Sequence, residues 1–241
     1  MNVGKPFRRA AIFGASGGIG GALATRLAER GVEVWAGSRS GTAADPALRA
    51  FRFDLSDERS LAQAAATMAD APPDLVIVAT GVLTLADGTG PERSYRQIDG
   101  AAMEEMFRLN TIGPALVAKH MLTLLPRDRR SVFAALSARV GSIGDNRLGG
   151  WHSYRASKAA LNMLMRNFAL ELARTHRQAV VAGLHPGTVD SALSEPFQAN
   201  LPEGQLTAPE QAAAHLLTVL DGLAPADSGK VFDWKGAEIP A

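Results

Sequence analysis

The sequence predicts an α/β protein with a doubly wound parallel sheet and helices on both faces, formed by a single domain over residues 1–241. Three observations predict this class. Apolar runs of strand length alternate with longer helical patterns about six times, which is the order of elements in such sheets. Leu75–Ala79 (LVIVA) is apolar on both faces, as a buried parallel strand is. No linker rich in Pro, Gly or Ser divides the chain, and no internal repeat is present.

The first strand–helix–strand unit lies at the start of the chain. Arg9–Phe13 is a short apolar run stopped by Gly14, and it is predicted as a strand. Ile19–Arg30 carries apolar residues at helical spacing and ends before Gly31, a residue that commonly follows a helix. Glu33–Gly37 is the second predicted strand.

The alternation continues to the end of the chain. Ser56–Ala69 is predicted as a helix capped by the Ser56 side chain, with acidic residues in its first turn. Ala101–Leu125 is predicted as one long helix that ends at Pro126. The remaining predictions are strands at Leu48–Phe53, Ser131–Leu136, Ala179–Leu184 and Lys230–Trp234, and helices at Tyr154–Thr175 and Pro209–Leu220.

Composition excludes several classes of function. The net charge of +1 gives no field that would attract nucleic acid or an acidic membrane face. No apolar run approaches the roughly 20 residues of a membrane-spanning helix, and the short run near the N-terminus indicates a strand rather than a signal peptide. The chain has no Cys, and its five His residues show no metal-ligand spacing. We therefore expect a cytoplasmic protein without a bound metal.

A glycine-rich turn follows the first strand and opens the first helix, Gly14-Ala-Ser-Gly-Gly18-Ile-Gly20. Glycines let the backbone turn sharply and approach a pyrophosphate at the helix N-terminus. The alternative is a turn that merely packs the helix closely. The strand–turn–helix context favours a Rossmann-type dinucleotide site, and no Gly-Lys-Ser/Thr follows to indicate a triphosphate loop. The cofactor-binding residues expected here are Gly14, Ser16, Gly18, Ile19 and Gly20.

The end of the second strand indicates the cofactor. NAD requires an acidic residue there for the ribose hydroxyls, whereas NADP requires a basic one. The segment reads Ser38-Arg39-Ser40, and Glu33 lies at the opposite end of the strand. Arg39 can pair with the 2′-phosphate of NADP(H), and Ser38 and Ser40 can add hydrogen bonds. The alternative for Arg39 is a solvated surface residue.

Tyr154-Arg-Ala-Ser-Lys158 completes an ordered set of motifs. The set consists of the glycine turn, Asp54-Leu55, Gly81, Asn110, a Ser after the fifth strand, Tyr154 with Lys158, and Pro186-Gly187. With it the chain resembles the single-domain short-chain dehydrogenases/reductases over essentially its whole length. Ser153–Asn162, the preceding Gly149-Gly150-Trp151 and the tail toward Ile239-Pro240 resemble the branch of C-signal and sniffer-type carbonyl reductases. The resemblance implies cofactor contacts at Asp54, Leu55, Gly81, Pro186, Gly187, Val189 and Ser191.

Tyr154 and Lys158 can be interpreted from their chemistry. They are four residues apart, so they share one helical face. A nearby ammonium favours the phenolate, so we expect a lowered Tyr154 pKa and a role as general acid/base. A chance pair on a solvated helix is the alternative. The resemblance adds ribose binding by Lys158 and a water held by Asn110, which could instead be a buried, helix-bending amide.

The expected substrate-binding serine departs from the family pattern more than any other motif. The family has two small residues before x-x-Gly, the second being the Ser that holds the substrate oxygen. The segment Leu136-Ser137-Ala138-Arg139-Val140-Gly141 puts Ala138 in that register. Adjacent strand residues face opposite ways, so Ser137 would need a local shift. We nevertheless predict Ser137 as the serine, with Ser142 as the alternative, and expect Ser137→Ala to cost about 10²-fold in kcat.

The loop after the sixth strand is expected to hold the nicotinamide through the Val189 backbone and the Ser191 hydroxyl. The following segment, with Leu193, Phe197 and Leu201, predicts a mobile lid over an apolar pocket, within residues 188–207. An ordinary surface loop is the alternative.

The sequence therefore predicts an enzyme that passes a hydride between NADP(H) and a small carbonyl or alcohol. A non-catalytic NADP-binding regulator is the alternative, which the intact Tyr154–Lys158 pair disfavours. A sugar-nucleotide epimerase is disfavoured because no long C-terminal substrate domain is present. Two long helices with surplus apolar positions, paired between subunits in the family, predict a homodimer or homotetramer.

Overall fold

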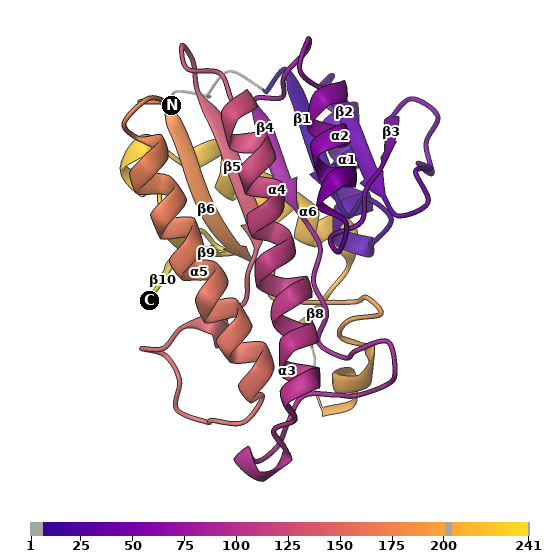
Figure 1. Ribbon diagram of the computed structural model, residues 1–241, viewed down its shortest axis with the longest axis vertical. Coiled ribbons are helices and arrows are strands. Elements are labelled where there is room, and N and C mark those ends of the chain that lie inside the picture. Colours follow the sequence, from indigo (N-terminus) through magenta and orange to yellow (C-terminus); the bar gives the residue numbers. More distant parts are fainter. Residues whose placement is uncertain (1–6, 201–203, 241) are drawn as a thin grey trace.

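The computed structural model describes residues 7–200 and 204–240. In this part of the chain the main sheet has the order β10-β9-β6-β5-β4-β1-β2-β3, with parallel pairing except between β10 and β9 (Figure 1). Its strands are β1 (Arg9–Phe13), β2 (Glu33–Ser38), β3 (Arg49–Arg52), β4 (Leu75–Val78), β5 (Ser131–Leu136), β6 (Ala179–His185), β9 (Lys230–Asp233) and β10 (Glu238–Ile239). The helices are α1 (Gly18–Glu29), α2 (Glu58–Thr67), α3 (Gly100–Phe107), α4 (Gly113–Met121), α5 (His152–Leu172) and α6 (Pro209–Gly222).

Helices cover both faces of the sheet, as the alternating sequence predicts. On one face α1 and α6 pack through residues such as Leu23 and Leu216. On the other face α2, α4 and α5 pack through Leu61, Met121 and Met165 (Figure 1). All residues of β4 and β5 are buried, which explains why these strands are apolar on both sides. The predicted doubly wound fold is confirmed.

The element prediction differs from the structure at β10 and at the start of α2. No sequence pattern indicated β10, a two-residue antiparallel strand on the edge of the otherwise parallel sheet. The predicted cap of α2 is also shifted, because Asp57 rather than Ser56 accepts the N–H of Arg59. The Ser56 hydroxyl instead donates to Asp54. A chain with several adjacent oxygen-bearing side chains can satisfy a helix terminus with any of them.

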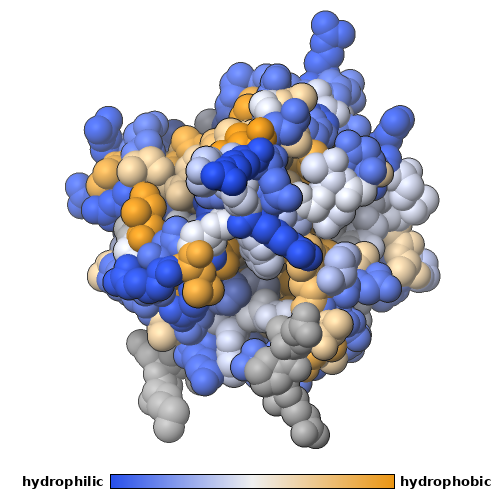
Figure 2. All heavy atoms as spheres, turned by 90° about the horizontal axis from the view of Figure 1, so that it is seen from below, coloured by the Kyte–Doolittle hydropathy of each residue, from blue (hydrophilic) through white to orange (hydrophobic). Residues whose placement is uncertain are grey.

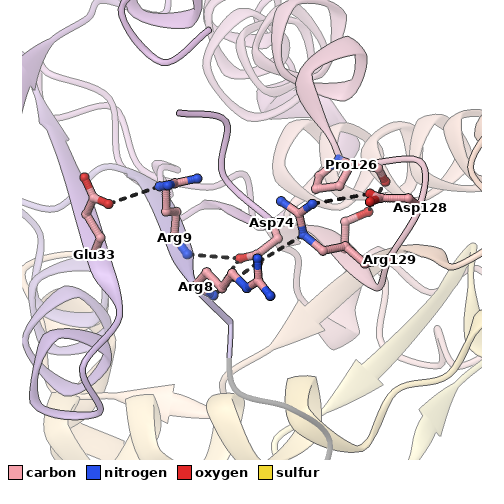
Figure 3. Close-up of polar contacts among 8 residues, drawn as sticks. Arg8, Arg9, Glu33, Asp74, Pro126, Asp128 and Arg129 are labelled. Carbon is pink, nitrogen blue, oxygen red and sulfur yellow. Dashed lines mark hydrogen bonds and ion pairs between the residues drawn. The ribbon is translucent and has the colours of Figure 1, made fainter. Parts of the chain in front are cut away.

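The amino ends of the strands are anchored by Asp74, which precedes β4 and is buried. Its carboxylate accepts the backbone N–H groups of Arg8 and Arg9 at 3.0–3.1 Å, and Arg129 lies 3.9 Å away (Figure 3). These contacts fix β1 against β4 at the end of the sheet opposite the predicted site. The strand order reverses between β1 and β4, and ligands of such sheets bind beyond the carboxyl ends of the strands at this point.

Candidate active site

The predicted site residues gather at the carboxyl end of the sheet, the lower end in Figure 1. The glycine turn follows β1, Gly81 follows β4, Ser137 follows β5 and Pro186 follows β6. Figure 2 views the molecule from this end and shows apolar patches separated by polar and charged side chains. Parallel pairing thus brings together residues that are more than 100 positions apart in the sequence.

The glycine turn forms a cradle in which Gly14 and Gly20 have no room for a side chain. Gly14 has a φ of +101°, and its N–H and that of Ala15 donate to Gly37 O at 3.1 and 2.8 Å. A Cβ atom on Gly20 would overlap the carbonyl group of Gly14. Helix α1 then begins at Gly18, with a glycine as N-cap and therefore without a side-chain cap. The first N–H groups of α1 are available to an anion, so the cradle fits a pyrophosphate.

The other residues of this turn occupy suitable positions. Ser16 and Gly18 are exposed at the mouth of the cradle, and Ile19 is half-buried against the core. Gly18 lies near Pro209 at the start of α6. Ser16 and Gly18 are thus exposed beside the start of α6, while Ile19 packs against the core beneath α1.

Arg39 is exposed directly after β2. The expectation that Ser38 adds a hydrogen bond to the cofactor was wrong, because its buried hydroxyl accepts from Gly41 N at 3.1 Å and donates to Thr42 O at 2.9 Å. Ser38 thereby shapes the turn that carries Arg39. Ser40 is exposed and bonds to the Thr42 hydroxyl at 2.7 Å.

Asp54 and Leu55 follow β3 as predicted. The Asp54 carboxylate accepts from the N–H of Ser56 at 2.8 Å and from its hydroxyl. These hydrogen bonds lower the pKa of Asp54 below its ordinary value. Leu55 packs against Gly113 at the start of α4, where a Cβ atom would lie 2.8 Å from that of Leu55. Hydrogen bonds from Ser56 therefore hold the Asp54 side chain, and packing against Gly113 holds Leu55.

Tyr154 and Lys158 lie in the first turns of α5, and both are buried. Lys158 Nζ donates to Leu136 O at 2.8 Å and lies 5.9 Å from the centroid of the Tyr154 ring. A Cβ atom on Gly81 would lie 3.3 Å from the same nitrogen, so the glycine lets the segment after β4 approach Lys158 closely. The structure brings Tyr154, Lys158 and Gly81 together.

The expected lowering of the Tyr154 pKa is wrong for the protein by itself. Burial raises the pKa of Tyr154 to about 12 and lowers the pKa of Lys158 to about 8. Desolvation disfavours the charged form of each group, and here it outweighs their mutual attraction. At neutral pH the pair is a neutral phenol beside an ammonium group.

The long helix predicted over Ala101–Leu125 is interrupted at Asn110. Between α3 and α4, Arg108–Ile112 forms a π-helical turn, a local widening that is frequent at functional sites. The buried Asn110 side chain accepts from Val82 N at 2.9 Å and donates to Val82 O at 2.8 Å. Asn110 therefore holds the segment after β4 against the helix, which agrees with the helix-bending alternative.

The structure does not place the predicted serine beside the phenol. The Ser137 hydroxyl donates to Asn162 Oδ1 on α5 at 2.6 Å. Ala138 instead belongs to the apolar cluster that contains Tyr154. Residues 137 and 138 project in opposite directions, as the alternation of side chains along an extended chain requires. Ser142, the alternative, is buried and accepts the N–H of Asp145 at 3.0 Å. We therefore assign Ser137 a structural role.

A cavity of about 700 Å³ adjoins the Tyr154 cluster. Its apolar wall comes from Leu85, Met106, Trp151 and Phe197. The Trp151 ring lies 6.3 Å from the Tyr154 ring and 5.3 Å from the Phe197 ring, between centroids. Phe197 belongs to the segment predicted as a lid, and it lines the cavity; Leu201 lies outside the described residues.

The loop after β6 is held by its own hydroxyl groups. Gly187 has a φ of +80° and packs against the Trp234 ring. Val189 lies in β7 (Thr188–Val189), which pairs with β8 (Leu206–Thr207). Its carbonyl accepts from the hydroxyls of Ser191, at 3.3 Å, and Ser194. Pro186 and Gly187 thus lead the chain from the sheet toward the lid.

Sequence reasoning missed one polar residue of the cavity. Glu92 is buried and contacts Ser153, the residue before Tyr154. It lies in an irregular connection, where no periodic pattern indicates which side chains turn inward. In residues 7–200 and 204–240, no group of three His, Cys, Asp or Glu side chains is arranged to hold a metal ion. None of the helices in these ranges is long and apolar enough to cross a membrane.

Comparisons with known proteins agree with this geometry. The C-signal of Myxococcus xanthus is 35% identical over 169 residues, covering 70% of this chain and 93% of its own length. The 1-hydroxy-2-glutathionyl-2-methyl-3-butene dehydrogenase of Rhodococcus sp. (strain AD45) is 31% identical over 229 residues, covering 91% of this chain and 93% of its own.

Solved structures share the fold. A protein of Burkholderia multivorans assigned to the short-chain dehydrogenases/reductases, with bound NADP, has a TM-score of 0.80 at 25% identity, covering 98% of this chain and all of its own. The carbonyl reductase Sniffer of Drosophila melanogaster has a TM-score of 0.82 at 17% identity, covering 97% and 99%. The family model described as short chain dehydrogenase matches residues 8–202. Both the ordered motifs and these matches lead to the same conclusion: the chain belongs to the short-chain dehydrogenase family.

Proposed function

We propose that the protein is an NADP-dependent oxidoreductase that reduces a small carbonyl compound, or oxidises the corresponding alcohol, with Tyr154 as the general acid/base. The observation that carries the proposal is the buried Tyr154–Lys158 pair, which lies with Gly81 at the end of the sheet where the glycine cradle opens. A regulator that only binds nucleotide has no need of a phenol and an ammonium group buried together, so the pair favours an enzyme.

The residues present fit NADP(H). The glycine cradle and the uncapped start of α1 would hold the pyrophosphate, and Arg39 would pair with the 2′-phosphate. Lys158 would bind the nicotinamide ribose, and the loop with Val189 and Ser191 would hold the carboxamide. The relative of known structure from Burkholderia multivorans, with NADP bound, supports this choice of cofactor. When bound, NADPH supplies the hydride.

The chain itself supplies and stabilises the proton. Because burial raises the pKa of Tyr154 to about 12, the phenol is protonated at neutral pH and can donate to a carbonyl oxygen. Lys158, with a pKa of about 8, is mainly an ammonium group at neutral pH and stabilises the phenolate that remains. Asn110 orients the segment after β4 through Val82.

The cavity favours a partly apolar substrate. Aromatic and aliphatic side chains form one wall beside Tyr154, and Phe197 of the proposed lid extends this wall through its contact with Trp151. The relative from Rhodococcus sp. (strain AD45) is named for a substrate that carries a hydroxyl group on a branched hydrocarbon chain. We propose a small, partly apolar aldehyde, ketone or alcohol for this protein.

Turnover by a tyrosine variant tests the function. Substrates are first found by following NADPH oxidation with a panel of aldehydes, ketones, diketones and quinones. On a verified substrate, Tyr154→Phe should lower kcat by about 10²–10⁴-fold, the usual contribution of general acid catalysis. NADPH binding should persist because the ring and Lys158 remain. Wild-type turnover in this variant would contradict the role of Tyr154, and a lack of turnover of the whole panel by the wild-type protein would favour the regulator.

Two further properties belong to the proposal. We propose a cytoplasmic protein, the expectation for a chain with this composition. We also propose a homodimer or a dimer of dimers, because Ile112, Met163 and Leu170 are large apolar residues exposed around α4 and α5.

A further inference from the structure

The first turn of α5 has an unusual beginning. Its N-cap residue is Trp151, which adopts a left-handed conformation with a φ of 50° and makes no side-chain cap. Gly149 and Gly150 before it also have positive φ, 63° and 66°. The first N–H groups of a helix need acceptors. The Trp151 side chain, which is at the N-cap position of α5, provides none. This is the turn that carries Tyr154.

Glu92 supplies the missing acceptors from a distant part of the chain. Its carboxylate oxygens accept the backbone N–H of Ser153 at 3.1 and 3.3 Å, and the Ser153 hydroxyl donates to the same carboxylate. The Glu92 carbonyl oxygen also accepts the N–H of Trp151 at 2.5 Å. The residue is 9% exposed. Three hydrogen-bond donors, one on Trp151 and two on Ser153, therefore converge on Glu92.

The charge of Glu92 suits this position. Burial raises its pKa, but the hydrogen bonds from Ser153 outweigh burial and the pKa stays below its ordinary value. The carboxylate is therefore ionised at neutral pH and lies at the positive end of a 21-residue helix, where a negative charge is stabilising. Both carboxylate oxygens accept hydrogen bonds from Ser153. Glu92 therefore anchors the start of α5 and does not serve as a general acid or base.

The anchor also joins two parts of the site. Glu92 belongs to the connection between β4 and α3, which contributes Leu85 and the neighbouring residues to the cavity wall. Ser153 lines the same cavity and directly precedes Tyr154. A movement of this connection would therefore be transmitted to the first turn of α5.

We propose that Glu92 is a positioning residue for Tyr154: by holding Ser153 it fixes the first turn of α5, the direction of the phenol and the cavity wall as one unit. The proposal rests on the proposed function, in which Tyr154 donates the proton. Glu92 acts on Tyr154 through Ser153, whose N–H and hydroxyl engage its carboxylate.

Three variants and a matched control test it. Glu92→Ala removes all side-chain acceptors, Glu92→Gln keeps one carbonyl oxygen for Ser153, and Ser153→Ala removes the hydroxyl alone. Asp57→Ala is the control, because Asp57 caps α2, a helix that carries none of the proposed site residues. For each variant kcat, KM, the NADPH dissociation constant and urea unfolding are measured on the full chain.

We expect Glu92→Ala to lower kcat about 10–100-fold while the NADPH dissociation constant changes less than about two-fold, since a misplaced proton donor reduces turnover without affecting the glycine cradle. Glu92→Gln should recover most of the loss. Asp57→Ala should lose comparable stability and keep its kcat. The effects of Glu92→Ala and Ser153→Ala should not add, because the two residues contact one another.

A spectroscopic readout is independent of activity. The chain has two tyrosines, and Tyr95 is 66% exposed. In a Tyr95→Phe background the ultraviolet titration of phenol reports on Tyr154 alone. Glu92→Ala should move the Tyr154 pKa from about 12 toward 10 as water enters the first turn.

Wild-type kcat in Glu92→Ala, or an equal kcat loss in Asp57→Ala, would overturn the proposal. If Glu92→Ala does not fold, Ser153→Ala and Glu92→Gln decide it by the same criteria. Failure of the proposed function is seen separately, as wild-type turnover in Tyr154→Phe.

Discussion

The Ser137 hydroxyl donates a 2.6 Å hydrogen bond to Asn162 Oδ1, and this bond joins the end of β5 to α5. Ser137 is buried and Asn162 is half-buried, so the hydroxyl is committed to this contact between β5 and α5. Ser137→Ala should therefore lower the free energy of unfolding by about 1 kcal/mol, the usual net value of a hydrogen bond, and lower kcat less than ten-fold. Urea unfolding and steady-state kinetics measure the two effects.

Ala138→Ser is the matched variant, because Ala138 packs in the cluster that contains Tyr154. A hydroxyl there should raise kcat for a carbonyl substrate, since one donor to a developing oxyanion is worth about 10²–10³-fold in other enzymes. A 10²-fold loss in Ser137→Ala would restore the original assignment, and such a loss in Ser142→Ala would move it to Ser142.

Stability should vary with pH through Lys158. Its pKa is about 8 in the folded protein against an ordinary value of 10.5. Between these values the unfolded chain binds more protons than the folded one, so the free energy of unfolding should rise with pH from about 8 to 10.5. Urea unfolding of the cofactor-free protein across this range measures the slope, and Lys158→Met should abolish it. An unchanged slope in that variant would assign the effect to another group.

Tyr154 should have the opposite effect on the free energy of unfolding at higher pH. Its pKa is raised from 10.0 to about 12, so its contribution to stability is present below pH 10 and is lost as the pH rises toward 12. Tyr154→Phe should remove this decline and leave the rise due to Lys158. Coincident curves for the variant and the wild type above pH 10 would contradict the assignment.

Arg39 should determine the choice of cofactor. Arg39 is exposed after β2, and the preceding Ser38 donates its hydroxyl hydrogen bond within the turn, to Thr42 O. Arg39→Ala should weaken NADPH binding by about 1.5–3 kcal/mol, the range for hydrogen bonds between charged groups, and hardly change NADH binding. Fluorescence titration with both nucleotides measures the difference. Arg59→Ala, which removes the same charge from an exposed position in α2, is the control; equal losses for both nucleotides would exclude the assignment.

The proposed dimer is tested by light scattering. Met163 is 61% exposed and Leu170 is 52% exposed on α5. We expect a dimer or tetramer at micromolar concentration, and dissociation when both residues are replaced by Glu, because charges buried without partners in an interface are strongly unfavourable. A monomer in the wild type would refute the proposal.

The sequence by itself determined the order of strands and helices, the glycine turn and the pairing of Tyr154 with Lys158. These features depend on local patterns: apolar periodicity, glycines that avoid a steric overlap, and a spacing of four residues on one helix. β1 and β5 begin and end where the sequence predicts them, at Arg9–Phe13 and Ser131–Leu136. Local rules are sufficient there because each strand is buried on both faces.

Only the tertiary structure decided which side chains face the site. Ser137 and Ala138 are adjacent in sequence, yet their contacts with α5 and with the Tyr154 cluster differ because the strand end projects them in opposite directions. Glu92 meets Ser153 across 61 residues, and burial rather than a neighbouring charge sets the pKa of Tyr154. Such relationships depend on which surfaces the folded chain brings together and removes from water, and no local pattern in the sequence specifies them.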